Sequence, residues 1–95
     1  KYNYMEERIA EYGMDYLNTN DYAEEIGLEP SADFYNRDHV NLLGADKYTK
    51  FLGEYLVRNY TLPDKRNDSA YRRWTQEYKE WNGRMEEIRE TLRLD

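Results

Sequence analysis

The residue type best suited to chemistry in this chain is histidine, and the sequence contains a single one, His39. It follows a polar stretch, residues 30–38, and lies directly before an amphipathic segment that starts at Asn41. A loop that is held by a helix can present an imidazole to a cleft, and an imidazole titrates near neutral pH. His39 is therefore a candidate general base, although a lone histidine in an acidic loop is more often solvated than catalytic.

The elements that must position this loop are expected to be helices. Apolar residues recur at steps of three and four before Gly13, again between Asn41 and Leu62, and again after Ser69. Asn41 is expected to cap the helix that follows the histidine, because its side chain can accept an unpaired backbone N–H. Gly44 is expected to allow close packing at the start of that helix.

The stretch before the histidine loop is expected to hold one brief helix and at most one short strand. Residues 18–21 offer N-caps for a helix that ends at Ile26 and Gly27. Residues 14–17 could form a strand only if a sheet were present to receive them, and these 95 residues encode no such sheet. The fold class expected is therefore mainly α with at most one short strand.

The last helix carries the strongest periodic signal in the chain. Its apolar positions alternate in steps of three and four over three heptads: Tyr71, Trp74, Tyr78, Trp81, Met85, Ile88 and Leu92. Such a face either packs on its own domain, which we favour, or forms a seam with a partner or a second copy. We expect Trp74 and Trp81 to be buried together on their own domain, and the chain to be a monomer.

Composition narrows the classes of function. A chain of 95 residues can bury one modest core, so it holds one domain at most. Its net charge of -6 opposes binding to nucleic acid, and no apolar run is long enough for membrane insertion. With no cysteine and one histidine among scattered carboxylates, neither a metal nor a cofactor is expected. The first helical pattern starts at Tyr2, after Lys1 rather than an initiator methionine, which indicates a piece of a longer protein.

One block of the sequence carries a family resemblance. It comprises His39-Val40-Asn41, Gly44-Ala45, Lys47-Tyr48-Thr49 and Leu52. This block resembles the last motif block of SGNH/GDSL hydrolases and related O-acyltransferases, in which the catalytic histidine lies immediately before the final helix. Residues 12–28 are similar to the final sheet strand and lead-in loop of such proteins, so the resemblance covers residues 12–60.

The resemblance implies the C-terminal part of a three-layer α/β/α, flavodoxin-like SGNH fold. Residues 1–60 would end that domain, residues 61–67 would be a connector, and residues 68–95 would form an amphipathic C-terminal helix. It further implies a bacterial serine esterase or O-acyltransferase that acts on a small or carbohydrate acyl ester. It also favours an extracytoplasmic location, whereas a chain without cysteine is compatible with either redox compartment.

The resemblance also implies roles for residues around His39. The histidine would take the proton from a serine hydroxyl, and a carboxylate would hold the other ring nitrogen. The family usually has that carboxylate three residues before the histidine, where this sequence has Asn36, an amide that can orient the ring but supplies no charge. Asp33 and Asp38 are the alternatives. Asp33 is favoured, because it could fold back toward the ring, whereas Asp38 adjoins His39 and should point elsewhere.

The serine nucleophile of the family is not found in this chain. Ser31 lies in a Pro-Ser-Ala-Asp loop, Ser69 lies where a helix cap is expected, and neither has a Gly-Asp-Ser type context. The chain alone is therefore predicted to be inactive, with the upstream part of the same protein as the partner that supplies nucleophile and oxyanion donors. The alternative hypothesis is a non-catalytic helical module for interaction or oligomerisation.

Overall fold

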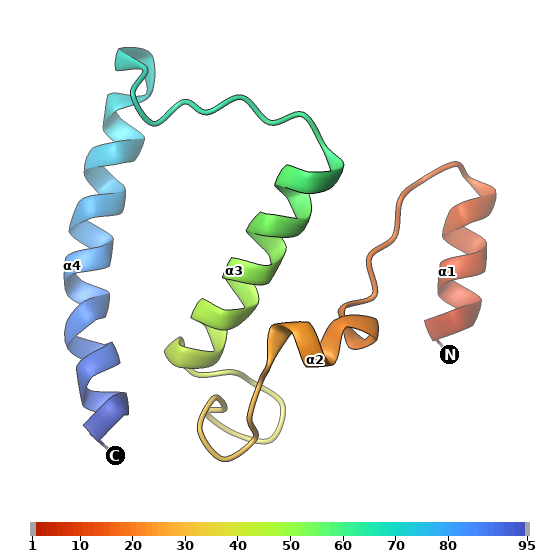
Figure 1. The fold of residues 1–95 in the computed structure, drawn as a ribbon, viewed down its shortest axis with the longest axis horizontal. Coiled ribbons are helices and arrows are strands. Elements are labelled where there is room, and N and C mark those ends of the chain that lie inside the picture. The colour runs from red at the N-terminus through yellow and green to blue at the C-terminus, as the bar shows by residue number, and fades with distance from the viewer. Residues whose placement is uncertain (1, 95) are drawn as a thin grey trace.

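Helices make up the fold of the computed structural model, which describes residues 2–94 and the side chains of residues 4–93. In chain order the elements are α1 (Tyr2–Glu11), the 3-10 turn η1 (Thr19–Tyr22), α2 (Ala23–Ile26), α3 (Leu42–Asn59), the 3-10 turn η2 (Ser69–Tyr71) and α4 (Arg72–Leu94) (Figure 1). The described residues contain no strand, only an isolated antiparallel bridge between Phe34 and Val40. The mainly helical prediction is confirmed.

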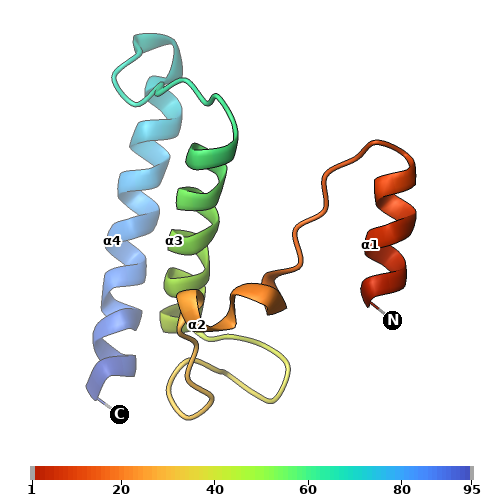
Figure 2. The same ribbon diagram turned by 45° about the vertical axis from the view of Figure 1, so that its right-hand side comes forward.

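The first helix ends at Glu11, and the turn that follows it contains Gly13, where the apolar pattern of the sequence stops. Gly13 has a φ of +70°, a conformation that a residue without Cβ adopts without strain. Residues 14–18 then run on without regular structure, so the segment considered for a strand has no partner to pair with. Both views show α1 standing apart from the other helices (Figures 1 and 2).

A small core lies between α2 and α3. Ile26 is 8% exposed and Phe51 is 5% exposed, and the rings of Tyr22 and Tyr55 pack around Phe51. The ring centroids of Tyr22 and Phe51 lie 5.1 Å apart, within the range in which aromatic pairs attract each other. Gly27, with a φ of +71°, ends α2 and directs the chain into the loop that precedes α3.

The two long helices, α3 and α4, run antiparallel beside each other (Figures 1 and 2). Arg89 of α4 makes a bidentate ion pair with Asp46 of α3, in which Nε lies 2.6 Å from Oδ2 and Nη2 lies 3.0 Å from Oδ1. Asn82 accepts a third bond from Arg89 at 3.1 Å. The planar guanidinium fits a carboxylate in this way, so a polar group fixes how α4 is rotated against α3.

The aromatic face of α4 is exposed, and the prediction that Trp74 and Trp81 are buried together is wrong for the described residues. Trp74 is 73% exposed, Trp81 is 54% exposed, and Tyr78 is also exposed. Fifteen residues separate Trp74 from Arg89, which places them about 60° apart around the helix at 100° per residue. By the same rule Tyr78 lies only about 20° from Arg89 and is 64% exposed, so the rotation of α4 does not by itself account for the exposed rings.

Two helix ends differ in detail from the sequence prediction. α3 ends at Asn59, before the Leu62 to which the apolar pattern extends, because Tyr60 already has an extended backbone with φ −135° and ψ 154°. At the start of η2 the capping residue is Asp68 rather than Ser69, since the Asp68 side chain accepts the N–H of Ala70 at 2.9 Å.

The helices form a single layer. The molecule measures 43 × 40 × 17 Å, and its radius of gyration is 16.8 Å, against about 12 Å for a compact domain of this length. Its accessible surface is 8613 Å², whereas a compact monomer of this mass would expose about 5,800 Å². Domains usually pack two or more layers around a core, so one layer leaves the outer faces of its helices uncovered. No described helix is long and apolar enough to cross a membrane.

Candidate functional site

The histidine lies in a tight hairpin between α2 and α3, residues 33–41, which we name the histidine hairpin (Figure 1). At its base the N–H of Asn41 donates to the carbonyl of Asp33 at 2.9 Å. One residue further out, Phe34 and Val40 form the antiparallel bridge. The paired backbone brings residues 36–39 together as the tip, so His39 is presented at the end of a short, closed turn.

The tip is organised around the side-chain oxygen of Asn36. This Oδ1 accepts the backbone N–H of Asp38 at 3.0 Å and that of His39 at 3.0 Å. It also lies 3.0 Å from Nδ1 of the His39 ring. The N–H of Tyr35 donates to the carbonyl of His39 at 2.8 Å, closing the turn. One amide therefore fixes both the backbone and the ring of the histidine.

These bonds determine which nitrogen of His39 carries the proton. A backbone N–H can only donate, so the atom of Asn36 that faces the two N–H groups must be its carbonyl oxygen. That oxygen can bond the ring only if Nδ1 donates, which leaves the lone pair of the neutral ring on Nε2. Nε2 has no bonded partner among residues 4–93. This is the tautomer that a base needs in order to accept a proton at Nε2.

Asp33, the acid favoured from the sequence, does not hold the ring. Its side chain is 2% exposed, and its Oδ2 accepts bonds from Nζ of Lys47 at 2.7 Å and from the N–H of Glu29 at 2.8 Å. Burial raises the pKa of Asp33, but the bonds from Lys47 and Glu29 lower it by more, so the pKa lies below its usual value of 3.8. The favoured pairing is thus corrected: the partner of His39 is Asn36.

The other sequence candidates also lie away from the ring. Asp38 is exposed, and the bond that it makes at the tip comes from its backbone N–H rather than from its carboxylate. Ser31 and Ser69 are exposed as well, in the turn before the hairpin and at the start of η2. Within residues 4–93, no hydroxyl is bonded to His39, so these residues bring no nucleophile to the base.

Asn41 and Gly44 join the base of the hairpin to α3. Oδ1 of Asn41 accepts the N–H of Gly44 at 3.0 Å, which confirms the predicted N-cap, and its Nδ2 donates to the carbonyl of Ala32 at 2.8 Å. A Cβ at Gly44 would collide with the carbonyl oxygen of Asp33 and would lie 2.9 Å from Cβ of Val40. Glycine therefore allows the hairpin to lie directly on the first turn of α3, as the sequence predicts.

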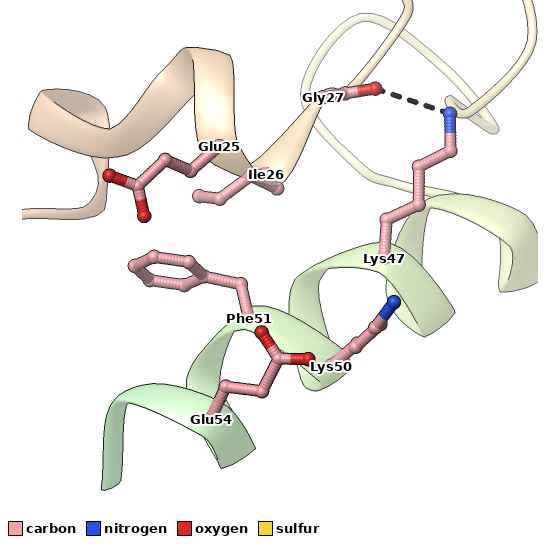
Figure 3. Close-up of a pocket in the computed structure, with 7 residues that line it drawn as sticks. All are labelled: Glu25, Ile26, Gly27, Lys47, Lys50, Phe51 and Glu54. Atoms are coloured by element: carbon pink, nitrogen blue, oxygen red, sulfur yellow. Dashed lines mark hydrogen bonds between the residues drawn. The ribbon is translucent and has the colours of Figure 1, made fainter. Parts of the chain in front are cut away.

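Lys47 is the residue of this site that sequence reasoning missed. Besides Asp33, its Nζ bonds the carbonyl of Gly27 at 3.2 Å, so one ammonium joins the end of α2 to the hairpin (Figure 3). In Figure 3 the Lys47 side chain reaches from α3 to Gly27, whereas the Lys50 side chain does not reach Gly27. A signal was available, because Gly44 and Lys47 are three residues apart and so share the helix face that the hairpin covers.

One shallow hollow borders the hairpin, and a second lies beside Lys47. One, of about 390 Å³, is lined by Pro30, Phe34, Asn36 and Arg37 and adjoins the amide that holds the His39 ring. The other, of about 340 Å³, lies between α2 and α3 and includes Lys47 and Phe51 (Figure 3). Across the described part of the chain, no three His, Cys, Asp or Glu side chains are grouped so that they could hold a metal ion.

No family model, curated protein or solved structure matches the chain. What the chain does must therefore be inferred from the geometry of the hairpin and from the sequence resemblance.

Proposed function

We propose that this chain is the C-terminal segment of a serine esterase or O-acyltransferase and that it supplies the general base, His39. One observation carries the proposal: Nδ1 of His39 lies 3.0 Å from Oδ1 of Asn36, so Nε2 is left as the basic, exposed nitrogen. From there it could take a proton from a serine hydroxyl while that oxygen attacks an ester carbonyl, and later return the proton to the leaving group. The resemblance of residues 33–56 to SGNH/GDSL proteins agrees with this role.

Asn36 gives the proposed base an orientation without a charge. The imidazolium that forms when Nε2 takes the proton keeps its Nδ1–H bonded to the amide oxygen, as in Cys-His-Asn enzymes. An amide dipole stabilises that cation less than a carboxylate would, because Coulomb attraction requires a full opposite charge. The site is therefore suited to general-base chemistry with a weaker stabilisation of the imidazolium.

The remaining catalytic groups are proposed to come from the upstream part of the same protein. That part would contribute the serine and the oxyanion donors, and it would also form the layer that covers the exposed helices. The thickness of 17 Å and the exposure of Trp74 and Trp81 support this requirement. The chain alone is expected to be inactive, and a small or carbohydrate acyl ester is the proposed substrate.

The proposal is tested by turnover of an activated acyl ester by the longer protein that contains this chain. His39→Ala should lower the rate constant by several orders of magnitude, as loss of an acyl-transfer base does. Asp38→Asn is the matched control, since its carboxylate makes no bond at the tip, and it should change the rate constant about twofold at most. Normal turnover by His39→Ala would remove the catalytic assignment.

A second candidate function, a non-catalytic interaction module, is favoured by the surface of α4. Tyr71, Trp74 and Tyr78 line an open hollow of about 630 Å³, and Trp81 extends the exposed face along the helix. Large exposed apolar surfaces usually mark sites of association. The upstream coding sequence separates the two functions, because a strand followed by a Gly-Asp-Ser type turn supports the enzyme and its absence favours the module.

A further inference from the structure

The contacts beneath the histidine hairpin assign a function to Asp33 that differs from holding the ring. We infer that the Asp33–Lys47 ion pair is a latch that positions His39, because it fixes the base of the hairpin on α3. Both residues are then positioning residues that act through the hairpin, not catalytic ones. This inference deepens the proposed function and rests on His39 being the base.

The latch joins three segments of the chain at one point. Nζ of Lys47 donates to Oδ2 of Asp33 at 2.7 Å and to the carbonyl of Gly27 at 3.2 Å. The same Oδ2 accepts the N–H of Glu29 at 2.8 Å. α3, the end of α2 and the base of the hairpin are therefore held together by one ammonium and one carboxylate.

The backbone of Asp33 is committed to the same junction. Its N–H donates to the carbonyl of Glu29 at 2.9 Å, and its carbonyl accepts the N–H of Asn41 at 2.9 Å. Its carbonyl also lies directly over Gly44, where a Cβ has no room. The backbone and the side chain of Asp33 therefore both hold the start of the hairpin at this junction.

The two partners of the ion pair differ in how deeply they are buried. The Asp33 side chain is 2% exposed, whereas that of Lys47 is 40% exposed. A buried carboxylate without a cation is costly, so removing Lys47 favours an opened base in which Asp33 regains water. Removing the charge of an exposed lysine such as Lys50 has no such consequence.

The tip and the base of the hairpin have different roles in placing His39. The bonds of Asn36 to Asp38 and His39 orient the ring at the tip, and they form while the backbone pairing below them, Tyr35 with His39 and Asp33 with Asn41, holds the two strands of the hairpin together. The contacts at the base, Asp33 with Lys47 and Asn41 with Gly44, orient the hairpin relative to α3. A ring that is well oriented at a loose tip would still miss its target, since misplacement by about 1 Å can cost about a hundredfold in rate.

The test compares Lys47→Met with Lys47→Arg, which keeps the charge, and with Lys50→Met as a matched control on the same helix. Amide hydrogen exchange of Tyr35 and Asn41 reports on the hairpin, and that of Phe51 reports on α3 in the same sample. The ring nitrogen-15 spectrum of His39 reports on the tautomer. Neither measurement requires catalytic activity, so failure of the latch and failure of the proposed function can be told apart.

In Lys47→Met we expect the amides of Tyr35 and Asn41 to exchange roughly tenfold faster or more, while the amide of Phe51 keeps its protection. The opened hairpin should also populate the Nε2–H tautomer of His39, because the bond to Asn36 is then made only part of the time. Lys47→Arg should restore most of both signals, and Lys50→Met should match the unmodified chain.

Three results would overturn the inference. One is hairpin exchange in Lys47→Met that equals that of Lys50→Met. Another is faster hairpin exchange with an unchanged His39 ring spectrum, which would make the ion pair structural without any effect on the base. If Lys47→Met also loses protection at Phe51, Asp33→Asn decides, because it keeps an acceptor for Glu29 while it removes the charge. Full protection of the hairpin in that variant is the third contrary result.

Discussion

At the scale of single residues, the site shows how an amide can reproduce the geometry of an acid without its charge. Oδ1 of Asn36 gathers the N–H groups of Asp38 and His39 together with the ring Nδ1. A carboxylate at position 36 could accept the same bonds, since it offers more lone pairs than the amide oxygen. The difference between Asn and Asp here is therefore electrostatic, and a single substitution can measure it.

Asn36→Asp should keep the tip geometry and add a negative charge about 3 Å from the ring. At a fixed pH near neutrality, the ring nitrogen-15 spectrum should then show a larger fraction of imidazolium at His39 than in the unmodified chain, because the new charge attracts the cation. If His39 is the base, turnover by the longer protein should rise as well, because the cation formed in the reaction is better stabilised. The double variant Asn36→Asp, Asp38→Asn keeps the net charge of the unmodified chain and serves as the control. An unchanged imidazolium fraction in Asn36→Asp would show that the ring does not contact position 36.

Asp33→Asn should lower stability in a pH-dependent way. The folded pKa of Asp33 lies below 3.8, so the ionised carboxylate stabilises the fold at all pH values above the unfolded pKa. That contribution is lost as the pH falls through the lower, folded pKa. Thermal unfolding followed by circular dichroism should thus show a gap between the unmodified chain and Asp33→Asn at about pH 7 that narrows toward about pH 2. A gap of constant size would mean that the charge of Asp33 contributes nothing.

At the scale of elements, the sequence predicts local features well and distant pairings poorly. The helix start at Asn41 is predictable, because a cap depends on residues three apart in the chain. The pairs Asp33–Lys47 and Asp46–Arg89 span 14 and 43 residues, and apolar periodicity carries no information about them. The spacing identified the aromatic stripe of α4 correctly, but spacing alone does not tell whether a neighbouring element covers that stripe, so the prediction of its burial was wrong.

The three glycines within the long helices should respond differently to alanine. Nothing lies within 4 Å of a Cβ built at Gly53 or Gly83, so each substitution should stabilise its helix by roughly 0.5–1 kcal/mol. Gly44→Ala should instead destabilise the chain, since the new Cβ collides with the Asp33 carbonyl. Denaturant unfolding of the three variants measures whether the free energy of unfolding rises or falls in each. A stabilising Gly44→Ala would contradict the placement of the hairpin on α3.

Truncating the aromatic residues of α3 and α4 should have unequal costs. Trp74 is 73% exposed, so Trp74→Ala should change the free energy of unfolding by about 0.5 kcal/mol or less. Phe51 is 5% exposed, and Phe51→Ala should cost about 3–5 kcal/mol, enough to unfold a protein of marginal stability. Urea unfolding of the two variants, followed by the circular dichroism of the helices, measures both changes in the free energy of unfolding. A large loss for Trp74→Ala would mean that α4 packs on this chain through its aromatic face.

At the scale of the whole molecule, the surface is too large for a compact domain of this mass. The excess over a compact monomer is about 2,800 Å², which is in the range that obligate interfaces bury. A layer 17 Å thick has room for one row of helices, each about 10–12 Å across with its side chains. The exposed rings of α4 and the separate position of α1 both belong to this single-layer arrangement.

The last prediction concerns Trp74 and Trp81, the two tryptophans of the chain. In the chain alone their emission should resemble that of solvated indole and acrylamide should quench it readily, because the rings are 73% and 54% exposed. If the chain is the C-terminal segment of a longer protein, as proposed, the emission in that protein should shift to the blue and quenching should fall, since its upstream part would cover α4. Subtracting the spectrum of a Trp74→Phe, Trp81→Phe variant isolates the emission of these two rings from that of other tryptophans in the longer protein.

A blue shift in the chain alone that grows with concentration would indicate a second copy as the covering surface, because self-association follows mass action. Tryptophans that remain solvated in the longer protein would show that α4 faces outward in the complete molecule, and the face would then be available to a separate partner.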